Sequence, residues 1–217
     1  MSQLFSEEQW AKVLQSLGVR LTTSVQWAHV CAELLVPENF SLGREEIDDF
    51  LAQIVHESAG LRRLEENLNY SPERMVAVWP RRFPTVEAAR PYAWHPIELA
   101  EKVYGGRMGN DQPGDGYRYR GRSPIMLTGK EGYELAQVET GLPLVDKPEL
   151  AATPRAGMQI AIAWWERRVP DEFIGNVDLV SRRVNGGSVG LAERRTLAAL
   201  AQLLIQGDSD AHIVHAG

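Results

Sequence analysis

Residues 43–58 place their apolar side chains at intervals of three and four, the spacing of a helix that buries one face. The positions are Ile47, Phe50, Leu51, Ile54 and Val55. Seven further segments combine helical patterning with start or stop residues, namely 6–18, 22–36, 71–83, 85–106, 153–168, 176–187 and 190–207. Strand-like alternation is scarce, with residues 117–129 as a plausible extended segment. The sequence therefore predicts a fold dominated by α-helices, with at most a short extended segment.

A chain of 217 residues can bury a sizeable core and fits one compact domain. The sequence shows no repeat, no low-complexity tract and no dividing linker, so we expect a single domain over residues 1–217, with N-terminal helices in 1–43. The net charge of −6, without a long basic run, argues against nucleic acid as a partner.

Features that would place the chain in a membrane or an oxidising compartment are missing from the sequence. No apolar stretch approaches the roughly 20 residues of a membrane-spanning helix, so no membrane insertion is expected. The first residues carry acids rather than the basic and apolar regions of a signal peptide, which predicts synthesis in the cytoplasm. Cys31 is the sole cysteine, which excludes an intrachain disulfide and a cysteine-based metal cluster.

Residues 109–129 form a segment rich in glycine between two helical regions. It contains five glycines, two prolines, three arginines and two tyrosines. A long loop of this kind within a compact domain is commonly functional, because binding groups sit on loops held by a rigid scaffold. The alternative, a flexible surface excursion, stays open on composition alone.

Two glutamates, Glu57 and Glu66, stand in contrasting settings. Glu57 falls at the edge of the buried stripe of its helix, where loss of solvation favours a protonated carboxyl suited to a general acid. Glu66 lies beyond Gly60 in a polar turn that would keep a carboxylate ionised. Carboxyls in contrasting settings are typical of acid and base roles. A surface salt bridge of Glu57 with Arg62 or Arg63 is the alternative, and spacing alone does not separate Glu66 from Glu65.

Other chemistries find little support. The His-Glu-Ser start of a zinc-protease motif lacks its second histidine, because position 60 is Gly60. No metal-ligand spacing connects the histidines, which are His29, His56, His95, His212 and His215. Nucleophile-elbow, phosphate-loop and dinucleotide motifs are absent from the sequence.

Three motifs in order resemble those of glycoside hydrolase family 19. They are HESAGLRRLEENLNYS at 56–71, GYRYRGRSPIMLTGKEGY at 116–133 and RRVNGG at 182–187. The resemblance extends over about residues 44–195 and is greatest to the bacterial and phage branch, which includes chitinase-like endolysins. It implies an α-helical, lysozyme-like fold of two lobes with a central substrate cleft, and it needs no metal or organic cofactor.

The resemblance also implies roles for individual residues. Glu57 is the expected general acid and Glu66, rather than Glu65, the expected general base, while Thr128 helps to hold the attacking water. Asn185 and Arg194 match positions that line the cleft or support the base.

Tyr70 and Met126 complete the expected substrate-binding residues. The chain departs from the family motif at Met126, where a glutamine is usual, and at Ser123, where a glycine is usual. Met126 lacks an amide that would hydrogen-bond near the substrate. Ser123 could alter a close approach of the backbone to the sugar. Neither change removes a carboxylate.

The expected reaction is inverting hydrolysis of a β-1,4 glycosidic bond, for which the two carboxyls stand about 6.5–9.5 Å apart with a water between them. The expected partner is the glycan strand of peptidoglycan, or a chitin oligosaccharide, bound by a monomer that has no separate wall-binding domain. An endolysin made in the host cytoplasm would reach the wall after release, and a secreted toxin is an alternative.

Two rival hypotheses belong to other classes. A lytic transglycosylase would need Glu57 but not Glu66, and would leave an anhydro-sugar end. A wall-binding module would tolerate the loss of either glutamate.

Overall fold

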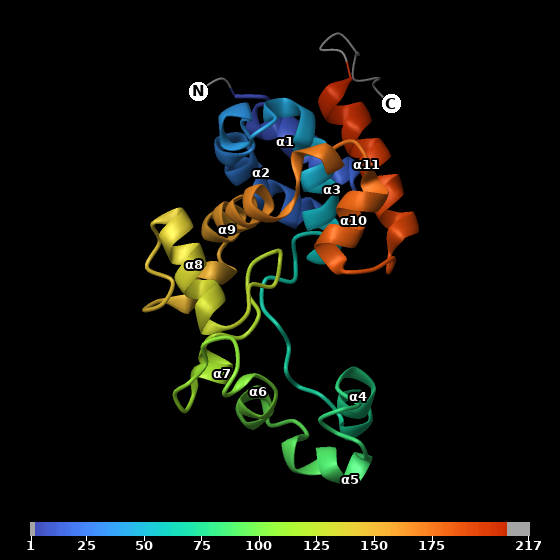
Figure 1. The fold of residues 1–217 in the computed structure, drawn as a ribbon. Coiled ribbons are helices and arrows are strands. Elements are labelled where there is room, and N and C mark those ends of the chain that lie inside the picture. The colour runs from blue at the N-terminus through green and yellow to red at the C-terminus, as the bar shows by residue number, and fades with distance from the viewer. Residues whose placement is uncertain (1–2, 208–217) are drawn as a thin grey trace. The chain divides into compact units, whose positions relative to one another are not determined.

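The computed structural model describes residues 3–207 and consists of helices joined by loops (Figure 1). The α-helices are α1 (Glu7–Ser16), α2 (Leu21–Leu34), α3 (Ile47–Glu57), α4 (Pro72–Val78), α5 (Val86–Ala89), α6 (Pro96–Tyr104), α7 (Asp115–Arg118), α8 (Lys130–Thr140), α9 (Pro154–Arg168), α10 (Val177–Asn185) and α11 (Leu191–Gln206). The 3-10 turns are η1 (Pro37–Asn39), η2 (Gly43–Glu46), η3 (Arg90–Tyr92), η4 (Pro148–Ala152) and η5 (Asp171–Phe173). Extended pairing within the described range is limited to isolated bridges of Arg122 with Glu65 and with Leu127. The prediction of a fold dominated by α-helices is confirmed.

The chain divides into two compact units. Unit 1 joins the residues up to Arg62 with those from Ala161 onward, and it contains α1, α2, α3, α10 and α11. Unit 2 runs from Arg63 to Ile160 and contains α4 to α8, and α9 passes from unit 2 into unit 1. The expected single catalytic domain over residues 1–217 stays a prediction, because compact units can belong to one domain.

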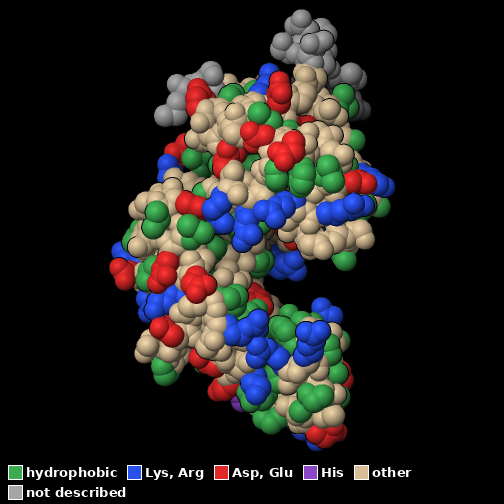
Figure 2. All heavy atoms as spheres, in the orientation of Figure 1, with side chains coloured by type: hydrophobic (Ala, Val, Ile, Leu, Met, Phe, Trp, Pro, Cys, Tyr) green, Lys and Arg blue, Asp and Glu red, His purple; other side chains and the backbone are tan. Residues whose placement is uncertain are grey.

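Acidic and basic side chains both occur on the face of each unit that Figure 2 displays, which agrees with a modest net charge. None of the helices within residues 3–207 is long and apolar enough to cross a membrane.

Helix α3 is the central helix of unit 1, and it packs against α10 and α11. The five apolar residues that predicted it are at most 3% exposed. Burying each such side chain contributes about 1.5–3 kcal/mol relative to an exposed one. The Phe50 ring makes edge-to-face contacts with Phe40 and Trp165, at centroid distances of 5.3 and 5.4 Å. The apolar stripe therefore fixes the position of the helix that ends at Glu57.

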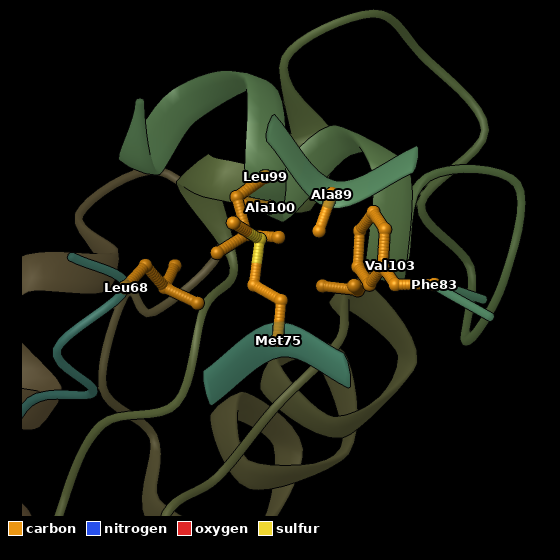
Figure 3. Close-up of a cluster of buried hydrophobic side chains, with 7 residues drawn as sticks. All are labelled: Leu68, Met75, Phe83, Ala89, Leu99, Ala100 and Val103. Carbon is orange, nitrogen blue, oxygen red and sulfur yellow. The ribbon is translucent and has the colours of Figure 1, made fainter. Parts of the chain in front are cut away.

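An apolar cluster in unit 2 holds the extended segment after α3 against α4, α5 and α6 (Figure 3). Its members are at most 2% exposed and are Leu68, Met75, Phe83, Ala89, Leu99, Ala100 and Val103. Met75 points from α4 toward the α6 side chains Leu99 and Ala100 (Figure 3). Because Leu68 lies between Glu66 and Tyr70 in the sequence, this cluster anchors the segment that carries both.

Several elements differ from the sequence expectations. The helix expected over residues 71–83 ends at Val78, shortly before Pro80. The single helix expected over residues 85–106 is wrong, because the chain breaks into α5, η3 and α6. Pro91 and Pro96 lack the backbone N–H that a continuous helix requires, and each begins or lies within a new turn. Helix α8 was not expected; it buries Tyr133 and Ala136 and leaves most of its surface exposed, so its apolar pattern is weak.

Candidate active site

Glu57 is the last residue of α3, and the chain turns sharply after it. The buried Ser58 hydroxyl donates to the Ile54 carbonyl at 2.6 Å and accepts from the Leu61 N–H at 2.9 Å. Ala59 and Leu61 adopt positive φ of 52° and 60°, in the region that favours glycine. Strained backbone of this kind is often found at functional sites. The turn ends the helix at Glu57 and fixes the start of its side chain.

Arg194 of α11 forms an ion pair with Glu57. Its guanidinium donates through Nη2 to Glu57 Oε1 and through Nη1 to Gln53 Oε1. Gln53 in turn donates to Ser181 Oγ of α10 at 3.2 Å, so three helices hold one network. The Arg194 side chain is 2% exposed and that of Glu57 is 27% exposed. Arg194 thus fixes the position of the Glu57 carboxylate, and the roles expected of both residues stay predictions.

Asn185 ends α10 and is exposed. Its Nδ2 donates to the Val189 carbonyl at 3.2 Å, and Gly186 takes the left-handed conformation that closes the helix. Asn185 therefore shapes the loop that leads into α11 and Arg194. Its expected contact with substrate stays a prediction.

Glu66 lies on an extended segment paired with the loop at 121–123. The Glu66 N–H donates to the Gly121 carbonyl at 2.8 Å, and the Gly121 N–H donates to Glu66 Oε2 at 3.3 Å. The Ser123 N–H donates to the Leu64 carbonyl at 3.0 Å. Part of the glycine-rich segment 109–129 is therefore hydrogen-bonded to the extended segment that carries Glu66, and this part is not a flexible surface loop.

A pocket of about 290 Å³ within unit 2 contains Glu66. Its lining residues are Arg63, Glu66, Asn67, Tyr70, Tyr104, Gly121, Met126 and Thr128. Four of the residues expected from the sequence, Glu66, Tyr70, Met126 and Thr128, thus line one cavity.

Tyr104, the last residue of α6, donates its hydroxyl to Glu66 Oε1 at 2.6 Å. Burial raises the pKa of Tyr104, and the charge of Glu66 and this hydrogen bond raise it further. The phenol therefore stays protonated at neutral pH and orients one oxygen of Glu66. Tyr104 was not predicted from the sequence, because a tyrosine at the end of an amphipathic helix has no distinguishing pattern.

Glu65 has a different environment from its neighbour. Its carboxylate pairs with Arg120, and Arg122 Nε lies 3.7 Å from Glu65 Oε2. The Arg120 guanidinium lies 4.1 Å from the centre of the Tyr117 ring. Because Glu65 is held by arginines and does not line the pocket, the geometry favours Glu66 as the reactive carboxylate.

The Thr128 hydroxyl faces the same small space as Glu66. Its Oγ1 donates to the Met126 carbonyl at 2.8 Å, which leaves its lone pairs as acceptors for a water. A Cβ added to Gly121 would lie 3.3 Å from both Thr128 Oγ1 and Glu66 Oε2. The glycine therefore preserves room beside the two oxygens.

Ser123 and Met126 both have positive φ, of 72° and 54°. Met126 is half-buried and lines the pocket, as expected for a residue near the substrate. Ser123 is 0% exposed, and within residues 3–207 its hydroxyl has no hydrogen-bond partner. The glycine usual in the family motif would suit this backbone better.

Among residues 3–207, no three histidine, cysteine or carboxylate side chains are placed to hold a metal ion. His56 Nδ1 lies 3.3 Å from Glu193 Oε2, and His29 Nδ1 lies 2.9 Å from Glu7 Oε1. His212 and His215 lie outside the described residues.

Comparison with known proteins gives relatives of one family. A Haemophilus influenzae protein described as a glycosyl hydrolase family 19 domain-containing protein is 34% identical over 163 residues, 74% of this chain and 79% of that protein. An endochitinase of Arabidopsis thaliana is 35% identical over 77 residues, 35% of this chain and 27% of the plant protein. No family model matches the chain.

Two solved structures share the fold. Chitinase C from Streptomyces griseus HUT6037 gives a TM-score of 0.59 at 16% identity and covers 94% of both chains. A family GH19 class IV chitinase from Zea mays gives 0.50 at 14% identity, over 91% of this chain and 81% of that one. At these identities the likeness concerns the fold alone.

Proposed function

The chain belongs to glycoside hydrolase family 19, and we propose that it hydrolyses β-1,4 bonds of bacterial peptidoglycan with Glu57 as acid and Glu66 as base. The observation that carries the proposal is the pocket in which Glu66, Tyr104 and Thr128 meet.

Glu66 deprotonates the attacking water. Tyr104 holds Glu66 Oε1, and the Gly121 N–H holds Glu66 Oε2, so the carboxylate keeps one orientation. The same water donates its other hydrogen to the Thr128 hydroxyl. With both hydrogens held, a lone pair of the water points toward the anomeric carbon. Positioning of this kind lowers the entropic part of the barrier.

Glu57 protonates the leaving glycosidic oxygen. Once the proton has left, Glu57 is a carboxylate, and the adjacent Arg194 guanidinium stabilises that charge. Gln53 and the packing of α11 keep the guanidinium in place. Hydrolysis through an acid and a base on separate carboxyls inverts the anomeric carbon.

Peptidoglycan is preferred over chitin because the motif LEENLNYS resembles the bacterial and phage branch, and because the relative that matches most of the chain is bacterial. The protein would act on the wall as an endolysin, as a monomer, after release from the cytoplasm in which it is made. Chitin is the second candidate, since the solved structures with this fold are chitinases.

The test compares purified peptidoglycan sacculi with chitin as substrates for the full chain. Mass spectrometry of the soluble products identifies the bond that is cut and the nature of the new ends. We expect reducing-end disaccharide products from sacculi at a higher rate than from chitin. Faster release from chitin would make the protein a chitinase, and anhydro ends would make it a transglycosylase.

A further inference from the structure

Trp94 exposes an unusually large apolar surface for a tryptophan of this chain. It is 63% exposed, whereas Trp10, Trp27 and Trp165 are at most 1% exposed. An indole has a broad apolar face and a polar N–H, so in water it is suited to binding a ligand that is itself part apolar and part polar. The position of Trp94 therefore calls for an explanation other than packing.

The backbone at Trp94 is held in a conformation that disfavours a bulky side chain. Its φ is +61°, in the left-handed region. Trp94 lies between η3 and α6, and hydrogen bonds fix the turn on both sides. The backbone N–H of Trp94 donates to the Tyr70 carbonyl at 3.2 Å, and the backbone N–H of His95 donates to the Tyr92 carbonyl at 3.2 Å. A glycine would meet the backbone requirement at lower cost, so the fold alone does not account for an indole here.

The turn of Trp94 is joined directly to the wall of the Glu66 pocket. Tyr70, which accepts the Trp94 hydrogen bond, lines that pocket together with Asn67. Tyr70 is itself held by Trp79, with ring centroids 5.2 Å apart. The exposed Asn69 lies on the same segment and adds an amide that can bond sugar hydroxyls. All of these residues belong to unit 2, so the arrangement is internal to one compact unit.

We propose that Trp94 is a sugar-stacking platform, a glycan subsite outside the Glu66 pocket that binds the apolar face of an N-acetylated sugar ring. The inference rests on the proposed function, because it takes a glycan strand as the ligand. A pyranose ring has one face of C–H groups that fits an aromatic ring and an edge of hydroxyls that fits amides. The indole of Trp94 and the amides of Asn67 and Asn69 supply both.

The binding experiment uses the full chain carrying Glu66→Gln, so that the glycan is not cleaved during the measurement. The probes are a soluble N-acetylglucosamine hexamer, measured by calorimetry, and peptidoglycan sacculi, measured by co-sedimentation. Adding Trp94→Ala is expected to weaken binding to sacculi about threefold to tenfold, which corresponds to about 0.6–1.4 kcal/mol. Trp94→Phe keeps a ring and should recover most of the affinity.

Three control variants distinguish ring stacking from non-specific apolar binding and from misfolding. Trp94→Leu keeps an apolar side chain without a ring, and it should bind as weakly as the alanine variant. Ile97→Ala removes a nearby side chain of α6 that is 52% exposed, and it should bind as the parent does. Trp94→Gly should melt at a higher temperature than Trp94→Ala, because it relieves the left-handed backbone, and yet bind no better.

The outcomes distinguish this inference from the proposed function. If the Glu66→Gln parent binds neither probe and the unsubstituted chain cleaves neither polymer, the proposed function fails and the platform with it. If the parent binds sacculi or hexamer and Trp94→Ala binds both equally well, the platform alone is overturned. Equal loss of binding in Ile97→Ala would also overturn it, because the effect would then be one of the local fold.

Discussion

Replacing Ser123 by glycine should stabilise the protein, although the residue is fully buried. Ser123 has φ +72° and a hydroxyl that has no hydrogen-bond partner within residues 3–207. A left-handed conformation costs a non-glycine residue about 1–2 kcal/mol. A buried unpaired hydroxyl costs about 1–3 kcal/mol. Glycine offsets about 0.5–1 kcal/mol of the stabilisation, because it gives the unfolded chain more conformational freedom.

The net expectation for Ser123→Gly is about 1–4.5 kcal/mol of added stability, or a rise in Tm of about 2–18 °C for a chain of this size. Ser123→Ala separates the two causes, because it removes the hydroxyl and keeps the strained φ. It should gain about 1–3 kcal/mol, less than the glycine variant, because the left-handed backbone is still strained. Chemical and thermal unfolding of both variants measure the difference.

Ser58 is the matched control. It is equally buried, but its hydroxyl makes two hydrogen bonds, to Ile54 and from Leu61. Ser58→Ala should therefore lose about 1–3 kcal/mol, the opposite sign from Ser123→Ala. If Ser123→Gly is no more stable than Ser123→Ala, the argument from backbone strain is wrong. If Ser123→Ala is less stable than the parent, its hydroxyl is bonded after all.

Three further predictions concern the pocket and one carboxyl outside it. Gly121→Ala should lower kcat about tenfold or more with little change in Tm, because the added Cβ would lie 3.3 Å from Glu66 Oε2 and from Thr128 Oγ1. Unchanged turnover of sacculi would show that the attacking water does not use this space. Met126→Gln should raise kcat/KM roughly several-fold, because residue 126 lines the pocket and the new amide can form a hydrogen bond of about 0.5–1.5 kcal/mol with the substrate. A fall in Tm without a change in kcat/KM would show that the side chain at position 126 packs in the core instead. For Glu166, burial and then the neighbouring charge of Glu46 raise the carboxyl pKa to about 7. Because this folded-state pKa lies above the unfolded value, the contribution to stability is full below about pH 4.5 and is lost as the pH rises through about 7. The Tm of Glu166→Gln should therefore fall less than that of the parent between acidic and mildly alkaline pH. The effect is small, because the Glu166 side chain is only partly buried and solvent screens its charge. Parallel curves of Tm against pH would refute the prediction.

The sequence predicted the parts of the molecule that depend on local patterning. Helix α3 follows from its apolar spacing, and it ends one residue before the end of the predicted range 43–58, whereas residues 43–46 of that range form the 3-10 turn η2. The position of Glu66 beyond that end was also predictable. What distinguishes Glu66 from Glu65 is a tertiary fact, the pairing of Glu65 with arginines of a loop more than fifty residues away.

Tyr104 and Trp94 show why the rest could not be predicted. Tyr104 meets Glu66 because α6 packs on the apolar cluster of unit 2, and that packing joins segments distant in the sequence. The exposure of Trp94 depends on a turn that interrupts the helix expected over residues 85–106. Arg194 was expected near the substrate or the base. Its ion pair with Glu57 depends on how α11 packs along α3, which the sequence does not show.

The central claim is that Glu57 and Glu66 together add water to a glycosidic bond. Digesting sacculi in water labelled with oxygen-18, followed by mass spectrometry of the new ends, tests it most directly. We expect labelled reducing ends from the unsubstituted chain and from Glu65→Gln, and none from folded Glu57→Gln or Glu66→Gln. Unlabelled anhydro ends, or labelled ends released at a near-normal rate by Glu66→Gln, would contradict it.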